Sequence, residues 1–107
     1  MNYSIEVTSL FEKQLKRLSK KFPSLKSEFT ALVLSLKQNP EQGKNLGNNC
    51  FKIRISIASK GKGKSGGARV ITHFQVFQSK VFLLSIFDKS EQSDIEDKDL
   101  NDWLNSI

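Results

Sequence analysis

The sequence CFKIRISIA, at residues 50–58, decides how this chain folds. Apolar and polar side chains alternate there, and the apolar ones are Phe51, Ile53, Ile55 and Ile57. A period of two predicts a β-strand with one buried face. Residues two apart on such a strand lie about 6.6 Å from each other, at roughly 3.3 Å per residue. Lys52 and Arg54 are therefore expected side by side on the opposite face.

The segment around this strand, residues 42–87, contains no Asp and no Glu. It carries eight cations: Lys44, Lys52, Arg54, Lys60, Lys62, Lys64, Arg69 and Lys80. Clustered like charges repel and destabilise a fold, so the cluster favours a function. Residues 88–107 are instead acidic, and the net charge of +6 hides this asymmetry. A basic body predicts a polyanionic partner, with nucleic acid the first candidate.

Composition predicts one globular domain over residues 1–107, with 37% hydrophobic and 26% charged residues. No apolar run is long enough to cross a membrane, and the first residues lack the pattern of a signal peptide. The only cysteine, Cys50, has no second cysteine with which to form an internal disulfide. We therefore expect a cytoplasmic protein without membrane contact.

Three further stretches have the alternation or composition of strands. They are residues 3–8, 68–77 and 80–87. The last is apolar on both faces, as in a central strand. Residues 41–49 and 59–67 are rich in glycine and polar side chains and are predicted to be loops. Gln78 and Ser79 are predicted to form a two-residue turn.

Apolar side chains three and four residues apart predict three helices. They are expected at residues 9–22, 24–37 and 97–107. Pro23 separates the first two, which makes them a helical hairpin. Ser9 and Glu12 match a capping box at the start of the first helix, and Asp97 is the expected N-cap of the last.

The resulting order, β-α-α-β-β-β-α, indicates the α+β class. We expect the N-terminal helical hairpin to pack on one face of a mostly antiparallel sheet, with a short C-terminal helix. The other face is then expected to be open to solvent. It would present Lys52, Arg54, Arg69 and His73.

Several enzyme classes are disfavoured by the residues present. Gly63-Lys64-Ser65 lacks a phosphate-loop glycine, because the required position is Ala58, and a strand follows instead of a helix. One cysteine and one histidine do not supply a zinc site, so no metal or cofactor is expected. His73 has two open interpretations, a structural residue or a general acid or base on an open face.

Three segments together resemble the RelE/ParE toxin superfamily, most closely its HigB-like branch. They are CFKIRI at residues 50–55, SKGKGKSGGARVI at residues 59–71 and FLLSIFDKSEQSDIE at residues 82–96. The resemblance implies a RelE-like toxin of a type II toxin–antitoxin system, an endoribonuclease that cleaves mRNA on the translating ribosome without metal. In that reaction the ribose 2′-hydroxyl attacks the adjacent phosphate and leaves a cyclic phosphate.

Carried over residue by residue, the resemblance implies a catalytic set of basic side chains. The set consists of Lys52, Arg54, Arg69 and Lys89, with His73 as a further catalytic candidate. Lys60, Lys62 and Lys64 are expected to bind ribosomal or messenger RNA backbone. Some relatives use a C-terminal tyrosine as general base, and Glu96 takes the matching position here. His73, Asp88 and Glu96 therefore remain the candidates for acid and base.

The resemblance also implies partners: a cognate antitoxin, the ribosome and mRNA. An acidic antitoxin segment is expected over the basic face or along the two N-terminal helices. Two alternatives stay open. ParE-like members of the superfamily poison DNA gyrase and do not cleave RNA, and a catalytically inactive relative would only bind its antitoxin.

Overall fold

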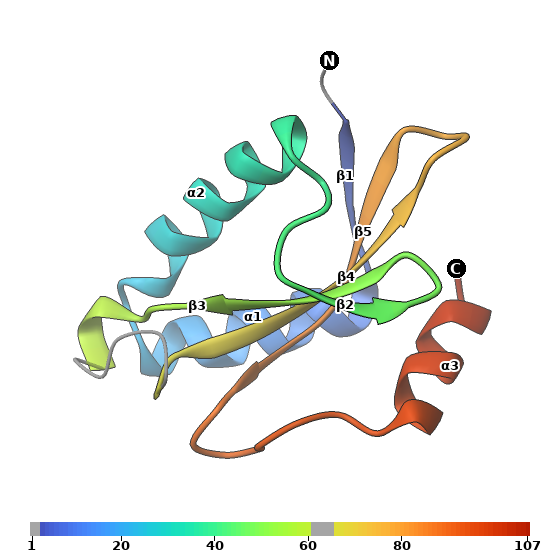
Figure 1. Ribbon diagram of the computed structural model, residues 1–107. Helices are drawn as coiled ribbons and strands as arrows, with labels where there is room; N and C mark the ends of the chain where they lie inside the picture. The colour runs from blue at the N-terminus through green and yellow to red at the C-terminus, as the bar shows by residue number, and fades with distance from the viewer. Residues whose placement is uncertain (1–2, 61–65) are drawn as a thin grey trace.

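The four predicted strand segments and one further short strand form a five-stranded sheet in the computed structural model, which describes residues 3–60 and 66–107 (Figure 1). The strands are β1 (Ser4–Val7), β2 (Lys44–Gly47), β3 (Cys50–Ile55), β4 (Ala68–Gln75) and β5 (Lys80–Asp88). Their order in the sheet is β1-β5-β4-β3-β2. β1 runs parallel to β5, and the other neighbours are antiparallel. The predicted α+β class and mostly antiparallel sheet are confirmed.

The predicted helical hairpin covers one face of this sheet (Figure 1). It consists of α1 (Ser9–Lys21) and α2 (Leu25–Gln38). Their apolar stripes bury Phe11, Leu18, Leu25, Leu32 and Leu36 in the main core. From the sheet, this core takes alternate residues such as Phe51, Ile53, Val70 and Leu83. The apolar faces of the helices and of the strands therefore pack against each other in one buried layer, which stabilises both kinds of element.

The opposite face is partly covered, so the expectation that it is open to solvent is wrong. A second apolar cluster lies there, formed by Cys50, Ile71, Leu84, Phe87 and Leu100. Trp103 and Leu104 of α3 (Asp97–Asn105) pack against it. The short third helix was predicted, although its N-cap is Glu96 and not Asp97. The apolar stripe of this helix is buried against the apolar residues on this face of the sheet.

The strand β2 was predicted to be part of a loop. It pairs antiparallel with β3 through a tight turn at Asn48 and Asn49. Both residues have φ near the left-handed region, 53° and 58°, as a two-residue hairpin turn requires. β3 itself ends at Ile55, before the predicted boundary, because the chain then turns into the short 3₁₀ helix η1 (Ala58–Lys60).

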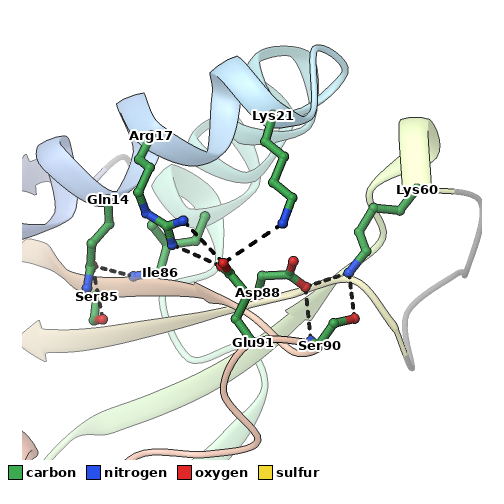
Figure 2. A network of polar contacts seen from close by, with 9 residues as sticks. All are labelled: Gln14, Arg17, Lys21, Lys60, Ser85, Ile86, Asp88, Ser90 and Glu91. Carbon is green, nitrogen blue, oxygen red and sulfur yellow. Dashed lines mark hydrogen bonds and ion pairs between the residues drawn. The ribbon is translucent and has the colours of Figure 1, made fainter.

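The hairpin between β4 and β5 also differs from its prediction. Gln75 pairs with Lys80, so four residues connect the strands where two were expected. The pairing also shifts register between Ile71 and Thr72. Such a shift removes backbone groups from the regular ladder. Gln14 of α1 compensates, because its Oε1 accepts hydrogen bonds from the backbone N of Ile86 at 3.0 Å and from Ser85 Oγ at 3.1 Å (Figure 2).

The first helix is capped by Thr8 and not by the predicted Ser9. Thr8 Oγ1 accepts a hydrogen bond from the backbone N of Phe11 at 3.2 Å. The same hydroxyl donates to the carbonyl oxygen of Leu83 in β5 at 2.9 Å. One side chain therefore both caps α1 and fixes its start to the central part of the sheet.

We expect Thr8→Ala to lower the free energy of unfolding by about 1–3 kcal/mol, because it removes an N-cap and a further hydrogen bond. Ser9→Ala is the matched control, since Ser9 lies at the first helical position. It should change stability by less than about 0.5 kcal/mol. Urea unfolding of both variants measures the difference, and equal losses would contradict the assignment of Thr8 as the cap.

Candidate functional site

Two arginines face each other directly at one end of the sheet. Arg54 of β3 pairs in register with Arg69 of β4. Arg54 is exposed, whereas Arg69 is only 4% exposed and donates from Nη1 to the carbonyl oxygen of Ala68 at 3.2 Å. Burial lowers the pKa of Arg69, Arg54 lowers it further, and Asp94 acts in the opposite direction. Like charges opposite each other destabilise a sheet, so this pairing favours a functional role.

Lys52 lies on the same face of β3, two residues before Arg54, as predicted. Its Nζ contacts both carboxylate oxygens of Asp94, at 3.1 and 3.2 Å. The Lys52 side chain is 16% exposed and that of Asp94 is 57% exposed. A hydrogen bond from the backbone N of Ile95 is the main cause that lowers the pKa of Asp94, and Lys52 and Lys89 lower it further. Asp94 is therefore ionised at neutral pH.

Lys89 joins this end of the sheet from the residue after β5. Its backbone N donates to the carbonyl oxygen of Gly67 at 3.0 Å, which holds it beside the start of β4. Its Nζ donates to the carbonyl oxygen of Ser93 at 2.8 Å. The structure thus gathers Lys52, Arg54, Arg69 and Lys89 at one end of one sheet face. We name these four residues the cationic end.

Lys60 points inward, which does not fit the role predicted for it in binding RNA backbone. Its side chain is 8% exposed, and its Nζ lies 2.5 Å from Asp88 Oδ1 and 2.9 Å from Ser90 Oγ (Figure 2). The Phe22 ring lies 5.2 Å from the same nitrogen, within the range of a cation–π interaction. Lys62 and Lys64, the other two lysines predicted to bind RNA, lie outside the described residues.

Both side chains of the ion pair between Lys60 and Asp88 are buried. Asp88 is 1% exposed and also accepts a hydrogen bond from the backbone N of Ser90 at 3.0 Å. Burial opposes ionisation of Asp88, but the hydrogen bonds from Lys60 and Ser90 outweigh it and lower its pKa. Its partners therefore keep the Asp88 carboxylate ionised. Because this carboxylate is buried and paired with Lys60, Asp88 is poorly placed to act as a general acid or base.

The turn before Lys60 is held by the start of the second helix. Glu28 Oε2 accepts a hydrogen bond from the backbone N of Ala58 at 2.6 Å. Ser24 Oγ accepts one from the backbone N of Ser59 at 3.0 Å. These two contacts fix η1 against the helical hairpin, and the pair between Lys60 and Asp88 fixes it to the end of β5. The roles of Ser24 and Glu28 cannot be predicted from the sequence, because the spacing of residues along a helix gives no sign of a contact with a segment about 30 residues away.

His73 lies apart from the cationic end. It pairs in register with Cys50, and its Nδ1 lies 3.5 Å from Cys50 Sγ. Burial raises the pKa of the Cys50 thiol to about 11 and lowers the pKa of His73. The pair is therefore neutral at pH 7, and no thiolate nucleophile forms. Ile71, part of the second apolar cluster, lies between Arg69 and His73 along β4.

A groove runs beside the cationic end. Its lining residues are Gln42, Gly43, Lys44, Lys52, Ile53 and Arg54. Gly43 has φ of 91°, and a Cβ at this position would lie 2.3 Å from the carbonyl oxygen of Lys52. Only glycine therefore lets the chain approach β3 closely enough to form this wall. Lys44, Lys52 and Arg54 make the groove basic, which suits a polyanionic chain.

Within residues 3–60 and 66–107, no three or more His, Cys, Asp or Glu side chains gather in a way that would hold a metal ion. No helix in the same ranges is long and apolar enough to span a membrane. Glu96, the remaining acid or base candidate, is exposed at the N-cap of α3.

Comparison with known proteins gives one family match and several structural ones. A family model described as the RelE toxin of the RelE/RelB toxin–antitoxin system matches residues 8–106. A mutant of the Escherichia coli toxin RelE in the free state is similar with a TM-score of 0.67 at 14% identity, covering 100% of this chain and 99% of that one.

Two toxin–antitoxin complexes are also similar. The intact Escherichia coli RelBE complex has a TM-score of 0.60 at 17% identity, over 80% of this chain and 95% of that one. The Mycobacterium tuberculosis RelBE2 complex has a TM-score of 0.55 at 14% identity, over 82% of this chain and 99% of that one. At these identities the structural matches establish the fold.

We expect Lys60→Met to lower the free energy of unfolding by about 3–5 kcal/mol, because it leaves the buried Asp88 charge without its partner. Arg17→Met is the matched control. Arg17 pairs with Glu91 at 3.0 Å on the surface (Figure 2), and its loss should matter by less than about 1 kcal/mol. Denaturant unfolding compares the two. A small loss for both would show that Lys60 is not structural.

Proposed function

The chain belongs to the RelE toxin family of toxin–antitoxin systems, and from that premise we propose that it is an endoribonuclease that cleaves mRNA on the translating ribosome. The observation that carries this proposal is the cationic end, where two strands and the residue after a third bring four basic side chains together. The HigB-like branch within the superfamily stays a prediction.

The cationic end suits the charge that develops when RNA is cleaved by its own 2′-hydroxyl. The 2′-hydroxyl loses its proton as its oxygen bonds to the adjacent phosphorus, the 5′-oxygen leaves and takes up a proton, and extra negative charge appears on the phosphoryl oxygens in the transition state. Arg54 can bind such a group through two parallel hydrogen bonds, and Lys52 acts as a point charge. Preorganised donors of this kind are each worth about 2–4 kcal/mol in a transition state. We assign the catalysis to these cations rather than to His73.

Arg69 has a second task in this proposal. Because it is nearly buried and lies directly opposite Arg54, it raises the positive potential at the surface without needing to reach the RNA itself. A charge beneath the surface in a medium of low dielectric acts strongly on nearby groups. Arg69 is therefore proposed to orient and strengthen the site that Arg54 and Lys52 present.

We also propose that a cognate antitoxin binds this chain, because the two similar complexes each contain a toxin bound to its antitoxin. An acidic antitoxin segment fits the cationic end, and it fits the basic outer face of α1. That face carries Lys13, Lys16 and Lys20, all exposed. Charge reversal at each surface, followed by copurification with the antitoxin, tests the two positions. Binding unaffected by both reversals would contradict an electrostatic contact.

We expect Arg54→Gln to slow cleavage of mRNA on purified translating ribosomes by about 10²–10³-fold, since it removes one transition-state donor. Arg54 is the sharper choice than Arg69, because Arg69 is buried and its loss would also disturb folding. Lys20→Gln is the matched control: it removes one exposed cation on α1 and should leave the rate unchanged.

Induced expression in growing bacteria, with transcript ends mapped by primer extension, separates the alternatives. New in-frame 5′ ends with the unaltered chain, absent with Arg54→Gln, support the ribosome-dependent nuclease. Growth arrest with intact mRNA would instead indicate a bound target such as DNA gyrase. No arrest would indicate a catalytically inactive relative that binds only its antitoxin.

A further inference from the structure

The acidic segment that begins at the last residue of β5 pairs each of its first three acids with a different cation. Asp88 contacts the buried Lys60, and Glu91 contacts Arg17 of α1. Asp94 contacts Lys52. Only the last of these pairs involves the cationic end, the place where the RNA phosphate is proposed to bind.

Asp94 is held in this position by the local fold of its own segment. Its Oδ1 accepts a hydrogen bond from the backbone N of Ile95 at 2.9 Å, and its carbonyl oxygen accepts one from Gln92 Nε2 at 2.9 Å. Lys89 Nζ donates to the carbonyl oxygen of Ser93 at 2.8 Å and so closes the same turn. The turn at residues 89–95 therefore presents one carboxylate to Lys52.

A carboxylate and a phosphate make the same kind of contact with a lysine: anionic oxygens accept hydrogen bonds from its ammonium group. Lys52 Nζ lies within 3.2 Å of both Asp94 oxygens. A phosphate oxygen that binds Lys52 must therefore displace Asp94 or share the ammonium with it. Arg69 and Lys89 also interact electrostatically with Asp94, and both belong to the same site.

We propose that Asp94 is an internal competitor for the RNA phosphate at Lys52, so that the turn at residues 89–95 restrains the toxin until RNA displaces it. This inference rests on the proposed function. Asp94 is more than half exposed, so its pair with Lys52 is screened by solvent and can be broken. The restraint thus lowers affinity for RNA without closing the site.

The test uses a short, fluorescently labelled 2′-O-methyl RNA, which binds but has no 2′-hydroxyl to react. We expect Asp94→Asn to tighten binding about two- to fivefold at low salt, the range that fits a half-exposed ion pair. Asparagine keeps the shape of the side chain and an oxygen for the Ile95 N–H. Glu91→Gln is the matched control, because it removes one carboxylate from the same segment and changes the net charge equally.

A double-mutant cycle with Lys52→Gln shows whether Asp94 acts through Lys52. The gain from Asp94→Asn should be absent when Lys52 is already replaced. If Lys52→Gln weakens binding but Asp94→Asn and Glu91→Gln behave alike, the RNA site stands and the competitor is overturned. If Lys52→Gln leaves binding unchanged, both the site and the competitor are overturned.

Cleavage on translating ribosomes supplies a second readout. If Asp94 is a competitor, Asp94→Asn should retain or increase kcat/KM, because no carboxylate then has to be displaced from Lys52 when the phosphate binds. Loss of cleavage by Asp94→Asn with RNA binding no tighter than that of the Glu91→Gln control would show that the reaction needs the Asp94 carboxylate, and would overturn the proposal.

Discussion

The buried ion pair between Lys60 and Asp88 is the contact on which the geometry of the cationic end depends. It joins the turn after β3 to the last residue of β5, and the Phe22 ring of the helical hairpin lies against it. Two desolvated charges stabilise a fold only when they stay together, because either one alone is strongly destabilising in the interior. The pair therefore fixes the position at which the acidic segment starts. From this position the segment runs back along the sheet, so that Asp94 contacts Lys52.

The acidic segment at residues 88–107 contacts the basic part of the chain close to the point where the segment begins. The last residue of β5 and the next two acids along the chain pair in turn with a buried lysine, a surface arginine of α1 and Lys52. Arg54 stays exposed beside this junction, and Lys44 lines the groove next to it. Exposed positive charge from β2 and β3 is thus concentrated on this rim of the sheet, although the two strands contribute separate basic residues. Such concentration is what steers a polyanion to one place on a protein.

Local periodicity predicted most of the fold. The alternation around Lys52 gave β3, and the apolar spacing around Phe11 and Leu18 gave α1. β2 escaped prediction because it is short and polar and becomes a strand only by pairing with β3. The cap of α1 moved by one residue, to Thr8, because the carbonyl oxygen of Leu83 offers Thr8 a second hydrogen bond. The open face was predicted wrongly, since the stripe on α3 does not say which surface it will cover.

The sequence by itself determined that the chain forms an α+β sheet with a helical hairpin, and that Lys52 and Arg54 share one strand face, because these properties depend on residues only a few positions apart. The tertiary structure alone decided which cations gather at the cationic end and which, like Lys60, form an ion pair in the interior. Lys60 meets Asp88 across 28 positions, and Lys52 meets Asp94 across 42. Contacts between residues so far apart in the sequence depend on how the helices and strands pack, and no local pattern of residues contains that information.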